Sequence, residues 1–379
     1  MEVDQSRRAA ERLEGENLSA RRASRGDILR TAAARLEESG RGGGDLLFLL
    51  RAGVAPGARA ALARTGEALE RATRDWEDLP LRDQALLAWT CLEACRCTGR
   101  RLYGETGRKI ADCFLERRRL PGGGFAEDGA TVGAGENGLA IGALALAYRV
   151  QGGERYLRAA EDARIFLKTR LTTPEGQLRR FWRNRAASGQ GTLEDYAFCL
   201  LGLLELYGAG FSASCLRQAA SLGTEAESLL RGGGQRGEHG RGAASLALGR
   251  LARLTGRRKY HRQPRDRGDL AAEAPDRGFA LLEDLEELYP PRDLVCVSAE
   301  DVPGWLPAAV GGRRLNTLVK TDGNSRGLER LAPYTASFPL PRRGQRLYLC
   351  HAGRCAPPVE DRYALERLLA EARITVEKG

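Results

Sequence analysis

The chain has 379 residues, which is long enough to bury a large core as one helical domain or as two smaller ones. Its net charge is +10, but only five of the sixty basic residues are lysines, a skew typical of a GC-rich genome. No apolar run approaches the roughly 18 residues of a membrane span, and the first residues do not resemble a signal peptide. We therefore expect a cytoplasmic protein that makes no use of a membrane.

The basic residues do not indicate a nucleic-acid partner. The arginines are spread along predicted helix faces and loops, without the interleaved aromatic residues that stack on bases. The nine cysteines are an odd number and mostly lie inside apolar helical runs, as free thiols do in a reducing compartment. The cysteines in such runs are Cys91, Cys95, Cys97, Cys113, Cys199 and Cys215.

The first predicted elements are an arm and a helical hairpin. Residues 1–26 mix charges of both signs with Gly and Ser and show no apolar period, which predicts a flexible charged arm. A first helix is expected over residues 27–39 and ends at the glycine run 42–44. From Asp45 an apolar helix is followed by a turn, and Pro56 opens a second, outer helix.

Four further inner and outer helix pairs follow, and they align on the glycine of the turn inside each pair. These glycines are Gly99, Gly152, Gly210 and Gly256, spaced by 53, 58 and 46 residues. Such a period marks repeated helix pairs. In the third copy, the stretch 196–207 is apolar on every side except at Glu205, and a helix that is apolar all round is buried all round.

The repeated pairs predict either an open superhelical solenoid or a closed double ring. Solenoid helices keep one exposed edge, so inner helices that are almost free of polar residues favour closure. We therefore predict an all-α fold, an (α/α) toroid of about five to six helical hairpins over residues 27–292. In a closed ring all inner helices run the same way, and their N-termini meet at one mouth. The residues collected there are Asp83, Gln84, Glu136, Asn137, Glu194, Asp195 and the loop around His239.

After Pro290 and Pro291 the sequence changes character. Short β-type runs occur at 294–297 and 346–350, a weaker one at 315–319, and a helix is expected over 363–372. These elements predict a small C-terminal α/β segment, residues 293–379, packed on the toroid.

Several motifs resemble the YyaL-like, spermatogenesis-associated thioredoxin-domain family. Members of that family join an N-terminal thioredoxin-like domain to an (α/α) toroid of the six-hairpin glycosidase type. The order and spacing of the motifs agree over roughly residues 45–370. The matching stretches are 83–87 (DQALL), 123–128 (GGFAED), 137–139 (NGL), 193–198 (LEDYAF), 251–256 (LARLTG), 348–350 (YLC) and 355–359 (CAPPV).

The chain also departs from that family. The first hundred residues offer no strand pattern and no Cys-x-x-Cys, so we expect no thioredoxin-like domain before the toroid. The resemblance leaves open whether a separate thioredoxin-like protein is a partner that supplies this domain. Glu136 stands where the family has a Trp, and Arg241 stands where it has the Asn of a Gly-Asn-Ser motif. Mouth positions have changed while packing positions have not, which is the pattern of a paralogue with altered or lost chemistry.

The candidate catalytic residues are the acidic residues at the starts of the inner helices. Asp83 and Asp195 are predicted to act as general acid and base on a sugar, with Glu194 shaping their pKa values. The simpler interpretation is that such residues cap helices and favour the positive end of the helix dipole. Glu127 and Asp128, after a Gly-rich turn, are expected either over the same mouth or in a solvated loop.

The candidate ligand-binding residues are of other types. Asn137 at the mouth, Trp182 among arginines and His239 in the mouth loop are predicted to bind a sugar or another small molecule. Trp182 is equally suited to packing. The pair Cys350 and Cys355 invites a metal interpretation, but one Cys pair without a second is a weak signal, and we expect no metal and no cofactor.

Two classes of function remain. The first is a carbohydrate-active enzyme, similar to glycosidases or sugar epimerases. The second is a non-catalytic toroid that binds a sugar, a metabolite or a protein partner. Turnover and calorimetric titration with a sugar panel distinguish the two.

Overall fold

The computed structural model describes residues 43–53, 59–232, 240–260, 277–351 and 353–377. The predicted arm 1–26, the predicted helix 27–39 and the loop of His239 lie outside the described residues. None of the described helices combines the length and the apolar character that a bilayer crossing requires.

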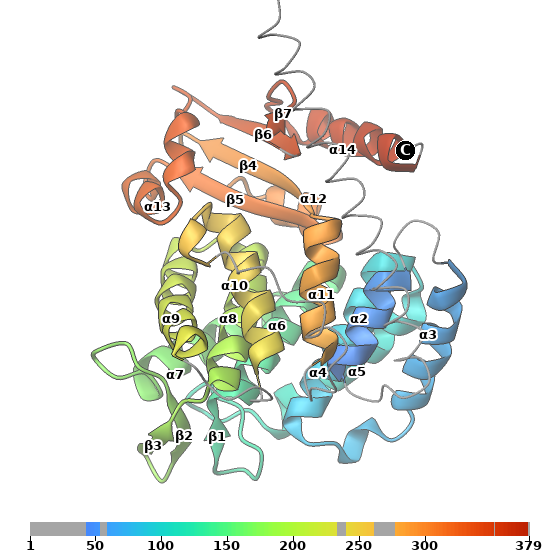
Figure 1. Ribbon diagram of the computed structural model, residues 1–379, viewed down its shortest axis with the longest axis vertical. Coiled ribbons are helices and arrows are strands. Elements are labelled where there is room, and N and C mark those ends of the chain that lie inside the picture. Colours follow the sequence, from blue (N-terminus) through green and yellow to red (C-terminus); the bar gives the residue numbers. More distant parts are fainter. Residues whose placement is uncertain (1–42, 54–58, 233–239, 261–276, 352, 378–379) are drawn as a thin grey trace, which may run out of the picture.

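The described part of the chain is dominated by a ring of six inner helices (Figure 1). Each inner helix contacts the next along the chain, and the last, α11, contacts the first, α2, so the ring closes. The inner helices are α2 (Gly43–Gly53), α4 (Leu81–Thr98), α6 (Ala134–Gln151), α8 (Leu193–Gly210), α10 (Arg241–Thr255) and α11 (Arg277–Leu288). The prediction of a closed (α/α) toroid is therefore confirmed.

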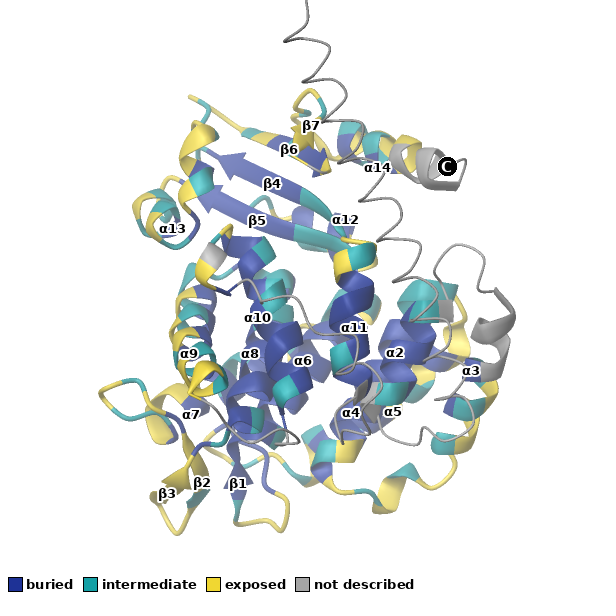
Figure 2. Ribbon diagram, viewed as in Figure 1, coloured by how far each residue is buried: buried dark blue, intermediate teal, exposed yellow. Residues whose placement is uncertain are grey.

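Outer helices cover the ring and explain its burial. They are amphipathic and present one apolar face inward; α5, for example, buries Tyr103, Ile110 and Phe114. Figure 2 shows the inner helices almost wholly buried, whereas the outer ones alternate between buried and exposed residues. The outer helices are α3 (Arg59–Ala72), α5 (Arg101–Arg117), α7 (Glu154–Arg170) and α9 (Ala213–Arg231).

Helices α6 and α8 approach each other unusually closely because glycines face each other. A Cβ built on Gly202 would lie 1.9 Å from the carbonyl oxygen of Gly138, and one on Gly138 would lie 2.4 Å from the backbone nitrogen of Cys199. Gly142 makes similar room for the ring of Trp89 on α4. Gly138 and Gly202 are required because no side chain fits between the backbones of α6 and α8.

The two ends of the ring carry different structures. At the end where the inner helices begin lies a three-stranded antiparallel sheet of β1 (Val132–Gly133), β2 (Arg179–Arg183) and β3 (Ala186–Gln190). The sequence did not predict this sheet. At the other end lies the C-terminal α/β segment (Figure 1).

The C-terminal segment is a four-stranded sheet with three helices, of which the sequence predicted three strands and the last helix. Its strand order is β5-β4-β6-β7, with β5 parallel and β6 antiparallel to the central β4. The strands are β4 (Arg292–Ser298), β5 (Leu315–Thr321), β6 (Gln345–His351) and β7 (Arg354–Cys355). The helices are α12 (Leu306–Gly311), α13 (Ser325–Leu331) and α14 (Arg362–Glu377).

The sheet is attached to the ends of α8 and α10. The backbone N–H of Val319 donates to the hydroxyl of Tyr207 at 3.1 Å, and the hydroxyl of Tyr334 donates to the carbonyl oxygen of Leu254 at 3.1 Å. Both contacts are largely shielded from water, so they fix the position of the sheet over this end of the ring.

Most of the described cysteines are free thiols, as the sequence predicted, and two form a disulfide that it did not predict. The six cysteines of the apolar helical runs are all free thiols. Cys350 and Cys355 form a disulfide that joins the neighbouring strands β6 and β7.

Candidate functional site at the N-terminal end of the ring

The starts of the inner helices meet through side chains of their first turns. The third residue of each of α4, α6 and α8 is acidic: Asp83, Glu136 and Asp195. A carboxylate in the first turn accepts from unpaired backbone N–H groups and is stabilised by the helix dipole. The preference for a carboxylate in the first turn of a helix therefore brings the carboxylates of three helices to one end of the ring.

Glu194 is paired with an arginine of another inner helix. Nη1 and Nη2 of Arg82 donate to the two carboxylate oxygens at 2.8 and 2.7 Å, which is the bidentate geometry of a strong ion pair. Burial alone would lower the pKa of Arg82, but the hydrogen bond and attraction to Glu194 raise it. The guanidinium also lies 5.1 Å from the ring centroid of Phe198. Glu194 thus links the start of α8 to the start of α4.

Asp195 forms a capping box with Thr192 and is only 7 % exposed. Its Oδ2 accepts from the backbone N–H and from the hydroxyl of Thr192, both at 2.8 Å. Its Oδ1 faces α6, because a Cβ on Gly135 would lie 2.8 Å from that atom. Nε of Arg180, on β2, lies 3.9 Å from Oδ2. One oxygen of Asp195 is therefore used for the helix cap, and the other faces α6.

Glu136, in the first turn of α6, has a raised carboxyl pKa. Burial raises its pKa, and repulsion from Asp195 raises it further, while Arg82 and Arg180 partly oppose the shift. Its carboxylate folds back against Gly133, where an added Cβ would lie 2.0 Å from Oε2. The sequence placed Glu136 at the mouth but not among the catalytic candidates. Its sequence signal is an acidic residue sixteen positions before the turn glycine, as at Asp83 and Glu194.

Asn137 and Glu127 hold the backbone at this end. The amide of Asn137, 0 % exposed, accepts from the N–H of Phe125 and donates to the carbonyl oxygens of Phe125 and Gly133, each at 2.8 Å. Glu127 accepts from the N–H of Leu81, the first residue of α4, at 2.8 Å. Both side chains are used to fix the loop between α5 and α6 to the helix starts.

The remaining candidates lie nearer the surface. Asp128 closes a turn by accepting from the N–H groups of Ala130 and Thr131, and the bond from Thr131 is the main cause of its lowered pKa. Asp83 is exposed, one residue from Arg82. Trp182 is half-buried on β2 and meets the ring of Phe166 edge-on, with centroids 5.2 Å apart. The structure therefore brings Glu136, Glu194 and Asp195 together with two arginines, while Asp128 belongs to an exposed turn.

No protein-family model matches the chain, and no curated protein matches its sequence. Solved structures match over the toroid. One is an inactive variant of an alpha-1,6-mannanase, GH76A of Salegentibacter sp. HEL1_6, in complex with alpha-1,6-mannotetrose, at 16% identity and a TM-score of 0.54, covering 70% of this chain and 99% of that one. Another is the Lin0763 protein of Listeria innocua, at 14% identity and a TM-score of 0.53, covering 65% and 84%.

A third match is the GH76 alpha-mannanase BT2949 of Bacteroides thetaiotaomicron, at 11% identity and a TM-score of 0.52, covering 65% of this chain and 85% of that one. At such low identities the likeness shows the fold. The expected membership in the thioredoxin-domain family has no support from these matches. The chain has the fold of the six-hairpin glycosidase-like (α/α) toroids.

Proposed function

We propose that the N-terminal end of the ring binds an oligosaccharide and cleaves it by acid and base catalysis. The observation that carries the proposal is the pair formed by Glu136 and Asp195. The raised pKa of Glu136 keeps its carboxyl protonated to higher pH, as a general acid requires, and Asp195 next to it provides a second carboxyl group.

The two carboxyl groups have distinct tasks in this proposal. Glu136 donates its proton to the leaving oxygen of the glycosidic bond, and Oδ1 of Asp195 acts on the opposite side as base or nucleophile. Glu136 thereby takes the role that the sequence assigned to Asp83. Arg82 and Arg180 hold the carboxylates and contact sugar hydroxyls, and the half-buried Trp182 supplies an apolar face for a sugar ring.

Two features of the similar structures support a sugar ligand. One toroid was captured with alpha-1,6-mannotetrose, in a variant inactivated by replacing two adjacent aspartates. In this chain two adjacent acidic residues, Glu194 and Asp195, open α8. The proposal does not need a thioredoxin-like partner, which rests on the sequence resemblance alone.

The test is turnover and binding with alpha-1,6-mannotetraose and a panel of other oligosaccharides. For Glu136→Gln we expect kcat to fall by about 10²–10⁴-fold with binding retained, because only the proton donor is lost. Glu105→Gln, at an exposed position of the outer helix α5, is the matched control and should keep full activity. Circular dichroism first confirms that each variant folds.

Two outcomes would count against the proposal. Saturable sugar binding by the wild-type chain without any turnover would remove the catalytic part and leave a sugar-binding toroid. If no oligosaccharide of the panel binds, both parts fail.

A further inference from the structure

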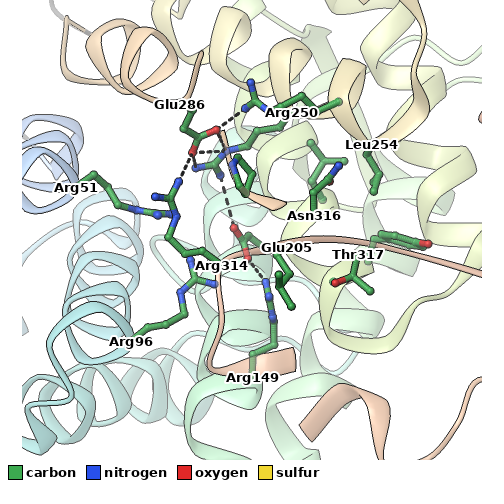
Figure 3. A pocket seen from close by; sticks show the side chains of 16 residues that line it. Arg51, Arg96, Arg149, Glu205, Arg250, Leu254, Glu286, Arg314, Asn316 and Thr317 are labelled. Carbon is green, nitrogen blue, oxygen red and sulfur yellow. Dashed lines mark hydrogen bonds and ion pairs between the residues drawn. The ribbon is translucent and has the colours of Figure 1, made fainter. Parts of the chain in front are cut away.

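A pocket of about 100 Å³ lies at the opposite end of the ring, between the last turns of the inner helices and the C-terminal sheet (Figure 3). The C-terminal parts of all six inner helices contribute to it, and residues 314–317 of the sheet side close it. Six of its lining residues are arginines: Arg51, Arg96, Arg149, Arg250, Arg253 and Arg314.

The arginines recur at a fixed place in the helical repeat. Arg96, Arg149 and Arg253 each stand three residues before the turn glycine that ends an inner helix. Because all inner helices run the same way, residues at equivalent positions in the repeat reach the same end of the ring. The repeat itself therefore gathers positive charge there.

Three carboxylates offset part of this charge. Glu286 accepts from Arg250 at 2.6 Å and from Arg253 at 2.5 Å, and these arginines outweigh burial and lower its pKa to about 2. Glu205 accepts from Arg149 at 2.7 Å and lies 3.6 Å from Arg250. Glu93 pairs with Arg51 and Arg96. Among these nine residues, the six guanidinium groups exceed the three carboxylates by three.

Several arginine donors are buried without a partner. Nη1 of Arg51, Nε of Arg96 and Nε of Arg149 have no hydrogen bond in the described part of the chain. The three side chains are only 5, 5 and 8 % exposed. Burial lowers the pKa of Arg149 by more than its attraction to Glu205 raises it. Glu205 therefore offsets only part of the cost of burying this positive charge. A buried donor without an acceptor is costly and marks a place where an acceptor can bind.

The carbonyl groups at the helix ends do not supply the missing acceptors. In each of α4, α6 and α10, one carbonyl of the last turn already accepts from the N–H of the turn glycine; these are the carbonyls of Cys95, Tyr148 and Ala252. Within the described ranges, the hydrogen bonds of the pocket arginines run to carboxylates and not to the backbone. The helix dipoles favour positive charge here but leave the N–H donors unpaired.

We propose that this pocket binds a small phosphate-class oxyanion, as a free ion or as the phosphoryl end of a small phosphomonoester. Arginine forks match the geometry of phosphate oxygens, and a doubly charged anion offsets most of the excess positive charge. The volume is below the roughly 300–1,000 Å³ of sites for drug-sized ligands, so a bulky nucleotide does not fit inside. Arg314, 32 % exposed, lies at the opening to solvent.

The test is calorimetric titration of the full chain with inorganic phosphate and, separately, with glycerol 3-phosphate, at fixed ionic strength. We expect saturable binding of at least one probe. Arg149→Gln and Arg314→Gln should each weaken it by about tenfold or more, because each removes a charged donor. Arg314→Gln is the safer variant for folding, since Arg314 is the most exposed of the six and lies 3.8 Å from Glu286.

The controls separate this site from the oligosaccharide site. Arg155→Gln, an exposed arginine paired with Asp112 on the outer surface, should leave phosphate binding unchanged. Glu136→Gln, at the other end of the ring, should do the same. The probe that binds more tightly identifies the source of the phosphate group. Absence of saturable binding of both probes, or binding that neither pocket variant weakens, would overturn the proposal and leave the arginines as a structural ion-pair network.

Discussion

Replacing Gly202 by Ala should destabilise the toroid, because α6 and α8 leave no space for a methyl group. The new Cβ would lie 1.9 Å from the carbonyl oxygen of Gly138, which is 1.5 Å short of the 3.4 Å at which ordinary contact begins. The obstacle is backbone, so relief requires the helices to separate and to lose packing along their length. Overpacking of a core typically costs about 1–3 kcal/mol, and for a backbone obstacle we expect about 3 kcal/mol.

Thermal unfolding followed by far-UV circular dichroism measures this effect. A loss of about 3 kcal/mol corresponds to a fall in Tm of about 4 °C for a chain of 379 residues, because an unfolding entropy of about 2.1 cal/mol/K per residue sums to about 0.8 kcal/mol/K. Gly210→Ala, at the end of the same helix, is the matched control, since its nearest neighbour would be Cδ1 of Leu157 at 3.8 Å. The control should keep or slightly raise the Tm. Equal Tm values for the two variants would refute the argument from close approach.

Three further predictions concern buried polar groups. Asn137→Ala should lower the free energy of unfolding in urea by about 3 kcal/mol, because it leaves backbone groups of Phe125 and Gly133 unpaired in a dry site; a loss within 0.5 kcal/mol, about that of a surface substitution, would contradict this account. The raised pKa of Glu136 means that its ionisation opposes folding, so Glu136→Gln should gain stability relative to wild type as the pH rises above about 4.5, and match it at lower pH; a gain that is constant with pH would exclude this cause. The pKa of Glu286 is lowered from 4.5 to about 2, so its contribution is present above pH 4.5 and is lost as the pH falls toward 2. Glu286→Gln should therefore cost on the order of 3 kcal/mol at neutral pH and little at pH 2, measured by urea unfolding across that range, and an equal cost at both pH values would refute it.

The architecture was accessible from the sequence because it depends on local patterns. The apolar run 196–207 indicates a helix buried on every side, and the turn glycines give the period of the repeat. Closure follows because such helices have no exposed edge. The β-type runs after Pro291 were likewise visible, since Val, Leu and Tyr are concentrated there.

The chemistry was less accessible because it depends on contacts between distant residues. Arg82 and Glu194 are 112 residues apart, and nothing in either local sequence indicates their bidentate pair. Strands β2 and β3 were missed because the segment 179–190 consists mostly of exposed residues without an alternating apolar pattern. Asn137 was predicted to bind a ligand from a motif, whereas its amide is occupied by three backbone groups. The role of a polar residue at a helix start is decided by its neighbours in space.

Closure of the ring between α2 and α11 has a consequence for how the protein is made. Leu46 to Leu50 of α2 are buried in the finished ring, and α11 is one of the two inner helices that cover α2. During synthesis α11 is the last of the inner helices to leave the ribosome. The side of α2 that packs against α11 therefore stays exposed to solvent until nearly the whole toroid has been made. Pairing the first helix with the last also makes this the contact of longest range in the ring, and such contacts form slowly. The seam between α2 and α11 is therefore where a nascent or partly unfolded chain is most exposed to chaperones and to aggregation.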